Sequence, residues 1–210
     1  LKLDRKTTHL ISSGTAICGG SAIAAVAPVI GATEKDMSIS LGVIFLLNSV
    51  ALILFPPIGL YLKLSQVDFG IWSAIAIHDT SSVVGAALAY GEEALKVATT
   101  VKLARALWII PVSILSMFLF KGKGNKVKIP WFIFLFILAI ILNSYFNIPT
   151  VITKGITTVS KSMLVLTLFL IGAGLSVQKI KEAGWKPMLL GIMLWLFISI
   201  SSLIAILYLS

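Results

Sequence analysis

Acidic side chains are scarce in this chain of 210 residues, which holds 8 Asp and Glu against 17 Lys and Arg. Charged residues make up only 12% of the sequence and hydrophobic residues 58%, against about 25% and roughly 45–50% in ordinary soluble domains. The mean hydropathy is +1.04. This composition excludes a single soluble globular domain. It also excludes a disordered chain, because disorder requires low hydrophobicity and many charges.

Cysteine and histidine are nearly absent as well, with one cysteine and two histidines in the chain. A single cysteine excludes an intrachain disulfide, and so few sulfur and imidazole ligands argue against a structural zinc site. We therefore expect neither a metal nor a cofactor. Cys18 has no partner that would make it a nucleophile, so we interpret it as a small apolar packing residue.

Charge is missing altogether from four long stretches, and about 20 apolar residues are enough to cross a bilayer core. These uncharged stretches are residues 37–62, 129–152, 162–178 and 187–210. Three further segments have the length of a span but carry polar interruptions, namely residues 7–33, 69–91 and 97–120. The sequence therefore predicts an all-α membrane protein, a polytopic helical bundle of about seven spans that forms one transmembrane domain over residues 1–210.

The net charge of +9 would suggest nucleic-acid binding in a soluble protein, but in a membrane protein it reports loop topology. Alternating crossings place 11 basic residues on one side, including the basic loop 121–128, and 4 on the other. Cytoplasmic loops are enriched in Lys and Arg. We therefore expect a multi-pass protein of the bacterial inner (plasma) membrane with the C-terminus outside, the lipid bilayer as its partner and no nucleic acid. Because the chain opens on Leu1 with a charged run, we also expect residues before it.

Two of the predicted spans are interrupted near their centres. Gly19 and Gly20 weaken the helix in the first, and Ser21 can cap a restarted helix. In the second, residues 78–82 read His-Asp-Thr-Ser-Ser. The two segments align at an offset of 60 residues, which suggests a repeat. Paired interrupted spans are typical of transporter binding sites, although glycines can also serve close helix packing.

Ionisable side chains lie inside two spans, where each costs roughly 2.5–3.5 kcal/mol on insertion scales and must face a partner. His78 and Asp79 interrupt one span, and Lys102 and Arg105 share one face of the next. One interpretation is an anion site, in which Arg105 binds an oxyanion in bidentate fashion and Lys102 adds charge. The other is an internal salt bridge with Asp79. The predicted substrate-binding set is Gly19, Gly20, Ser21, His78, Asp79, Thr80, Ser81, Ser82, Lys102 and Arg105.

The ICGG run at residues 17–20, the stretch HDTSSVVGAA from His78 and the KxxR pair of Lys102 and Arg105 resemble the YeiH-type family of bacterial inner-membrane proteins. Sulfate export is attributed to that family. The resemblance covers essentially the whole chain and implies the C-terminal two-thirds of a longer protein. It also implies an inverted-repeat architecture similar to that of bile-acid and cation/proton carriers, and secondary transport of a small anion.

We therefore predict a secondary transporter of a small inorganic or organic anion, with sulfate or sulfonate export as the leading hypothesis. A proton- or sodium-coupled carrier of another solute and a membrane scaffold without transport activity are the alternatives. An enzyme is not expected, because the sequence offers no nucleophile paired with a base. A homo-oligomer remains open.

Overall fold

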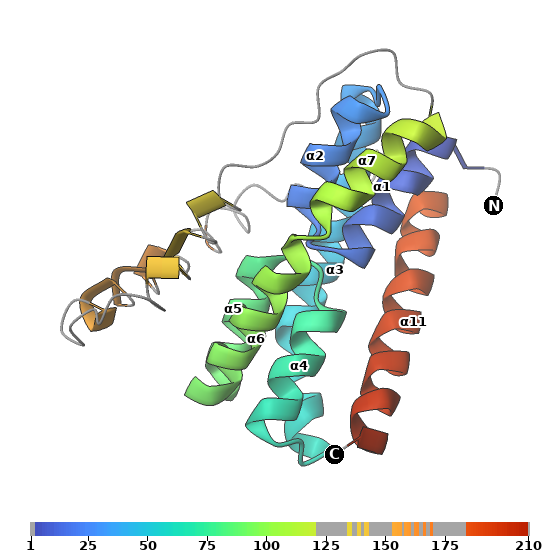
Figure 1. The fold of residues 1–210 in the computed structure, drawn as a ribbon. Helices are drawn as coiled ribbons and strands as arrows, with labels where there is room; N and C mark the ends of the chain where they lie inside the picture. Colours follow the sequence, from blue (N-terminus) through green and yellow to red (C-terminus); the bar gives the residue numbers. More distant parts are fainter. Residues whose placement is uncertain are drawn as a thin grey trace.

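The computed structural model describes residues 3–120 and 184–209, together with short pieces between residues 134 and 169. This described part is helical and contains no strand, which confirms the predicted all-α class (Figure 1). Its helices are α1 (Arg5–Ala16), α2 (Gly20–Val29), α3 (Glu34–Tyr61), α4 (Gln66–Ala76), α5 (Thr80–Tyr90), α6 (Glu92–Ala106), α7 (Ile109–Phe120) and α11 (Trp185–Leu209).

Three helical stretches among the described residues are long and apolar enough to cross a membrane. They are α3, the joined α6 and α7, and α11, with 28, 29 and 24 residues in the apolar stretch. At 1.5 Å per residue even the shortest is about 36 Å long, more than the roughly 30 Å of a hydrocarbon core. They match the predicted spans 37–62, 97–120 and 187–210. The predicted spans 129–152 and 162–178 and the basic loop 121–128 lie largely or wholly outside the described residues.

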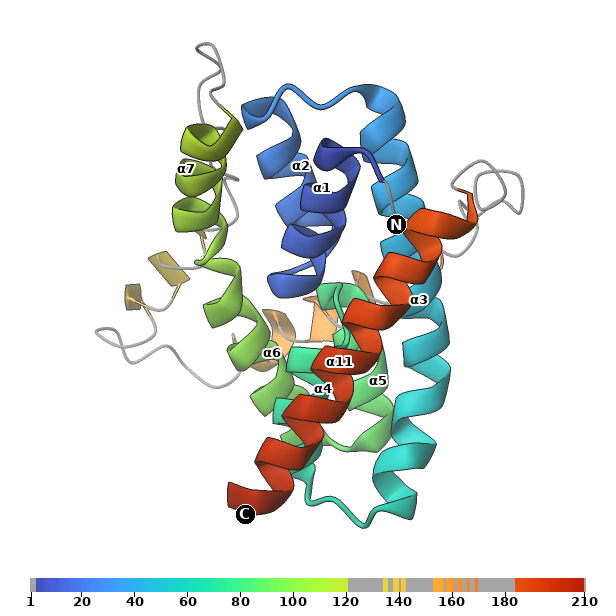
Figure 2. The ribbon, with the colours of Figure 1, turned by 90° about the vertical axis from the view of Figure 1, so that its right-hand side faces the viewer.

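The boundary between α6 and α7 has a local cause in Pro111. A proline lacks the backbone N–H, and its ring clashes with the carbonyl four residues earlier, here that of Leu107. The backbone tightens at this point, with the Trp108 N–H donating to the Arg105 carbonyl at 3.1 Å. The two helices nevertheless follow one another along the bundle (Figure 2).

The first interrupted segment doubles back on itself, so α1 and α2 form a helical hairpin rather than one crossing. Lys6 Nζ, near the start of α1, donates to the Gly31 carbonyl just after α2 at 2.6 Å. At 12 and 10 residues, the two helices are only about 18 and 15 Å long, half the depth of a membrane. The predicted break is confirmed, but the predicted crossing 7–33 is wrong. Gly19, with φ +61°, adopts the left-handed backbone that the reversal requires.

The second interrupted segment folds in the same way, and α4 and α5 form a second hairpin. Phe69 near the start of α4 stacks on Tyr90 at the end of α5, with ring centroids 3.8 Å apart. The Tyr90 hydroxyl also donates to the Leu64 carbonyl at 2.6 Å. These contacts place the open ends of both arms together, so the predicted crossing 69–91 is also a hairpin, reversing at residues 77–79.

The two hairpins enter the bundle from opposite ends and meet tip to tip. Helix α3 runs the length of the bundle beside both hairpins, as Figure 2 shows. A Cβ built on Gly19 would lie 3.4 Å from both the Asp79 nitrogen and the His78 carbonyl carbon. The helix boundaries follow the predicted offset of 60 residues: α1 ends at Ala16 and α4 at Ala76, and α2 and α5 begin 60 residues apart. The repeat is therefore a pair of inverted hairpins.

Replacing two crossings by hairpins exchanges two basic residues between the ends of the bundle. Thr7 Oγ1 donates to Asp36 Oδ1 at 2.9 Å, so Lys35 lies at the end where α1 begins. Lys63 lies at the other end, where α3 stops. The exchange is one for one, which leaves the predicted imbalance of basic residues unchanged. Helix α11 runs from the same end of the bundle as α3 but is tilted against it, with Trp195 beside Phe55, and the C-terminus lies at the end opposite the start of α1.

Candidate functional site

The meeting of the hairpin tips brings four helix ends to one level inside the bundle. Helices α1 and α4 end there, and α2 and α5 begin there. Each helix end leaves backbone groups without an intrahelical partner, carbonyls at a C-terminus and N–H groups at an N-terminus. In a membrane such groups must be satisfied by the protein or by a ligand, because lipid offers no hydrogen bonds.

Lys102 satisfies the C-terminal end of α4. Its side chain is 0% exposed, and Nζ donates to the Ile77 carbonyl at 2.6 Å and to the Ala74 carbonyl at 3.3 Å. A cation at a helix C-terminus also compensates the negative end of the helix dipole. The partners of Lys102 are thus backbone carbonyls of the second hairpin.

Arg105 lies one turn further along α6 and joins the two hairpins. Nε donates to the Ala16 carbonyl at 2.9 Å and Nη2 to the Thr15 carbonyl at 3.3 Å, both at the end of α1. Nη1 donates to the carbonyls of Ala74 and Ile75 in α4, at 3.2 and 2.6 Å. These bonds use four of the five guanidinium N–H groups. The sequence predicts the Arg105 guanidinium group as an anion ligand, but most of its N–H groups bind the protein's own backbone.

Asp79 caps the N-terminus of α5. Its carboxylate accepts hydrogen bonds from the backbone nitrogens of Ser81 at 3.1 Å and Ser82 at 3.4 Å. A carboxylate is a favoured cap at this position, because it accepts orphan N–H groups and meets the positive end of the helix dipole. These backbone bonds, rather than a salt bridge to Lys102 or Arg105, are the interactions that the structure gives to Asp79.

Asn48 is a site residue that sequence reasoning missed. It lies midway along α3 and is 2% exposed, and its Oδ1 accepts from the backbone nitrogens of His78 at 3.0 Å and Asp79 at 3.3 Å. Its Nδ2 group, a donor, has no partner among the described residues. The available signal was that Asn48 is the single side-chain amide in the uncharged stretch 37–62.

His78 is buried at the tip of the second hairpin. Its exposed fraction is 0%, and neither Nδ1 nor Nε2 has a hydrogen-bond partner in the described part of the chain. Buried polar atoms without partners are rare in folded proteins, since each costs about 1–3 kcal/mol. Together with Asn48 Nδ2, the imidazole leaves unused hydrogen-bonding capacity where the hairpins meet.

The N-terminus of α2 differs from that of α5 in having no side-chain cap. Its N-cap residue is Gly19, which aligns with Asp79 at the offset of 60 residues. The Cys18 sulfur contacts the Ala22 N–H and the Ser21 hydroxyl, but sulfur is a weak acceptor. Gly20 and Ser21 in the first turn are half-buried, so this helix end remains accessible. The N-cap position of α5 therefore holds a carboxylate, and the equivalent N-cap position of α2 holds a glycine.

The structure brings every predicted site residue to this region. The tips and the first turns of α2 and α5 hold the polar and glycine residues Gly19, Gly20, Ser21, His78, Asp79, Thr80, Ser81 and Ser82, and α6 presents Lys102 and Arg105 to the ends of α1 and α4. Asn48 completes the set from α3. We call this set, with Asn48 included, the tip site.

Comparison with known proteins identifies relatives over nearly the whole chain. The family model of conserved hypothetical protein 698 matches residues 1–191. A UPF0324 membrane protein of Bacteroides thetaiotaomicron is 56% identical over 204 residues, covering 96% of this chain and 62% of the relative. A UPF0324 membrane protein of Photobacterium profundum is 57% identical and covers 97% and 62%. One from Shewanella oneidensis is also 57% identical and covers 99% and 66%.

The chain thus spans about three-fifths of the length of the curated relatives that it matches. No solved structure matches it. The relatives are named as membrane proteins, in agreement with the long apolar helices of this chain. The chain belongs to the conserved hypothetical protein 698 family, whose curated relatives here are UPF0324 membrane proteins.

Proposed function

We propose that the protein is a secondary transporter of the inner membrane that carries a small oxyanion, such as sulfate or a sulfonate, by alternating access around the tip site. The observation that carries this proposal is the N-terminus of α2, which has no side-chain cap and whose N-cap Gly19 packs against the Asp79 nitrogen. Asn48 binds that same nitrogen through Oδ1, and its donor Nδ2 has no partner among the described residues. A helix N-terminus with free donors is a ready-made anion site.

The charges of the tip site support an anion in particular. Lys102 and Arg105 bring two positive charges and Asp79 one negative charge, which leaves a formal charge of +1. The helix dipoles add about −0.5 at the ends of α1 and α4 and about +0.5 at the starts of α2 and α5, so the dipoles cancel. A buried charge of +1 without a counter-ion is costly in a membrane. A bound anion would supply the missing negative charge.

We assign the individual roles from what each side chain already binds. The backbone N–H groups of the first turn of α2, the Ser21 hydroxyl and Asn48 Nδ2 would donate directly to the anion. Lys102 and Arg105 would act mainly through their charge, because most of their donors bind carbonyls. Asp79 would keep the start of α5 closed to the anion.

The opposed hairpins also suit alternating access. Each hairpin opens toward one end of the bundle, and the two tips share one level beside α3 (Figure 2). Transporters built from inverted repeats hold their substrate at such a midplane junction, and they expose it to either side by moving one repeat against the other. The proposal is therefore transport rather than catalysis.

The test is sulfate flux into proteoliposomes that contain the purified protein. Ser21→Asp would place a carboxylate in the first turn of α2, where its negative charge would meet the positive end of the helix dipole and repel the anion. Ser21→Asn, a neutral variant of similar size, is the matched control. We expect Ser21→Asp to abolish flux and Ser21→Asn to retain most of it. Wild-type flux through Ser21→Asp would refute the assignment of the anion to α2.

A proton-coupled carrier is the second candidate, and the observation that favours it is the buried imidazole of His78, which has no hydrogen-bond partner among the described residues. An imidazole can take up a proton on one side of a membrane and release it on the other. This candidate keeps the same site and changes only what drives the solute.

A further inference from the structure

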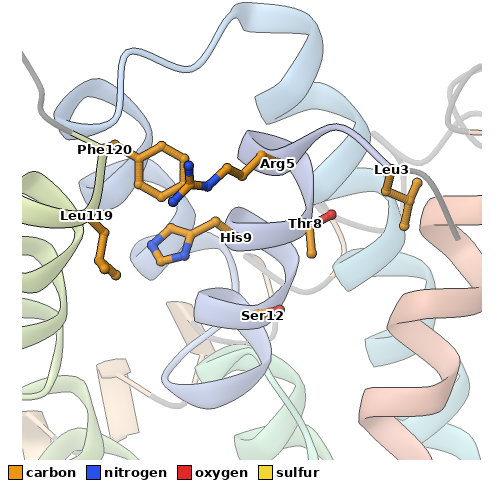
Figure 3. A pocket seen from close by; sticks show the side chains of 7 residues that line it. All are labelled: Leu3, Arg5, Thr8, His9, Ser12, Leu119 and Phe120. Carbon is orange, nitrogen blue, oxygen red and sulfur yellow. The ribbon is translucent and has the colours of Figure 1, made fainter.

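A pocket of about 420 Å³ opens beside α1, at the end of the bundle where α1 begins and α7 stops. Figure 3 shows its polar side chains, which come from α1, and its apolar wall, which comes from the last residues of α7. The residues that concern us are Arg5, Thr8, His9 and Ser12 on α1, and Leu119 and Phe120 on α7.

Three contacts hold the side chains of Arg5 and His9 in place. The Arg5 guanidinium lies over the Phe120 ring, 4.9 Å from its centroid, and the His9 ring packs against the same phenyl group. His9 Nε2 is also 2.8 Å from the Ser116 hydroxyl of α7. The acidic neighbour Asp4 is occupied as the N-cap of α1, where it accepts from the Lys6 and Thr7 nitrogens. Arg5 therefore presents its charge to the pocket without a carboxylate partner among the described residues.

The pocket continues as a polar stripe along α1 toward the tip site. Arg5, Thr8, Ser12 and Ala16 are spaced by three or four residues and so share one face of the helix. All four are at least partly exposed. The 12 residues from Arg5 to Ala16 are joined by 11 steps of helical rise, so the stripe is about 16 Å long. The Arg105 Nε bond to the Ala16 carbonyl lies at its inner end, at an exposed position. The stripe thus links two guanidinium groups through two hydroxyl groups.

We infer that this pocket is the entrance through which the anion reaches the tip site from the end of the bundle where α1 begins. The inference rests on the proposed function. Arg5 attracts the anion, Thr8 and Ser12 replace part of its hydration, and the charge of Arg105 draws it onward. The stripe carries no acidic side chain, so it favours anions over cations along its length.

The charge of Arg5 has a calculable effect on ions that reach Ser12. Seven residues of helix separate the two positions by about 10 Å. In a water-filled pocket, one charge at that distance changes the local concentration of a monovalent ion about twofold at low salt, upward for an anion and downward for a cation. The ratio of anion to cation at Ser12 should therefore change about fourfold when Arg5 is neutralised.

The test measures access by cysteine labelling, which does not require transport. Cys18, the single cysteine, is 1% exposed and can be replaced by alanine to give a cysteine-free background. Ser12→Cys then reports on the pocket, and Ser13→Cys is the matched control because Ser13, one residue further on, is buried at 5% exposure. Thr8→Cys gives a second position in case Ser12→Cys fails to fold. The probes are membrane-impermeant thiosulfonates carrying either a sulfonate or a trimethylammonium group, in vesicles of phosphatidylcholine without anionic lipid.

We expect Ser12→Cys and Thr8→Cys to react from one side of the vesicle only, at least tenfold faster than Ser13→Cys. After each rate is divided by the rate of that reagent with a free thiol in solution, the sulfonate reagent should be favoured over the cationic one, and Arg5→Gln should lower this preference at Ser12→Cys about fourfold. Equal relative rates of labelling by the two reagents, or no effect of Arg5→Gln on their ratio, would refute the proposal that this pocket is the entrance. So would unreactive cysteines at both positions, since they would show a stripe covered by lipid or protein. None of these outcomes depends on Ser21, so failure of the entrance and failure of the tip site can be told apart.

Discussion

Two substitutions of Asn48 test separately whether the tip site depends on hydrogen bonds to the backbone and whether it depends on its positive charge. Its Oδ1 accepts from two buried backbone nitrogens, those of His78 and Asp79, at 3.0 and 3.3 Å. Asn48→Asp keeps an oxygen at this position and should preserve both bonds. It also replaces the donor Nδ2 by a second carboxylate oxygen, which would bring the formal charge of the tip site from +1 to zero. We therefore predict a folded protein that no longer holds an anion.

The size of this effect follows from the geometry. A carboxylate about 4 Å from a bound anion repels it by about 4 kcal/mol at an effective dielectric constant of about 20. At 1.4 kcal/mol per factor of ten, the affinity for a singly charged sulfonate should fall about a thousandfold, and the affinity for sulfate, which carries two charges, should fall by more. Asn48→Leu should instead lower the stability of the protein. It leaves two buried N–H groups unsatisfied, at about 1–3 kcal/mol each, and adds no charge. We expect Asn48→Leu to be the less stable of the two variants.

The assay is thermal unfolding in detergent, with and without sulfate. Wild-type protein should show a transition temperature that rises with sulfate concentration, as expected for a ligand that binds the folded state. Asn48→Asp should unfold near the wild-type temperature but show no rise. A sulfate response of Asn48→Asp equal to that of the wild type would refute the electrostatic reasoning, and a stable Asn48→Leu would refute the structural part.

Two further predictions concern the other buried groups. Lys102→Met should destabilise the protein by about 1–3 kcal/mol, because the Ile77 carbonyl loses a charged donor in a buried place while the Ala74 carbonyl keeps Arg105 Nη1; thermal unfolding without ligand measures this, and an unchanged transition temperature would contradict it. If His78 carries the coupling proton, sulfate flux in proteoliposomes should depend on an imposed pH gradient in the wild type and lose that dependence in His78→Gln. Wild-type flux that ignores the gradient would remove His78 from coupling.

The positions of the helix breaks were predictable from the sequence because their causes are local. Adjacent glycines disfavour a helix wherever they occur, and an aspartate followed by small polar residues caps one. The offset of 60 residues aligns the two breaks in the sequence itself. The gathering of His78, Asp79, Lys102 and Arg105 also followed from the cost of placing a charge in lipid.

The reversal of each hairpin was not predictable in the same way. A glycine break is compatible with a helix that continues in the same direction and with one that turns back, and the choice depends on tertiary contacts such as Lys6 with Gly31 and Phe69 with Tyr90. The distribution of basic residues does not distinguish hairpins from crossings either. Lys35 and Lys63 exchange ends of the bundle, so the number of basic residues at each end stays the same.

The partners of the buried cations were missed for a related reason. Attraction between opposite charges suggested Asp79 as the partner of Lys102 or Arg105. The reversal instead brings the C-terminal carbonyls of α1 and α4 to these cations, and the N–H groups of α5 to Asp79. Every residue has the same backbone groups, so a sequence does not show which carbonyl and N–H groups are free to bind a charged side chain. The positions of the helix ends in the fold determine this.

The central claim, that the tip site holds one oxyanion at the start of α2, is tested most directly by equilibrium binding of radiolabelled sulfate to the purified protein. We predict saturable binding of one sulfate per chain, displaced by methanesulfonate, lost in Ser21→Asp and retained in Ser21→Asn. Saturable binding that persists unchanged in Ser21→Asp, or no saturable binding to the wild type, would contradict the account.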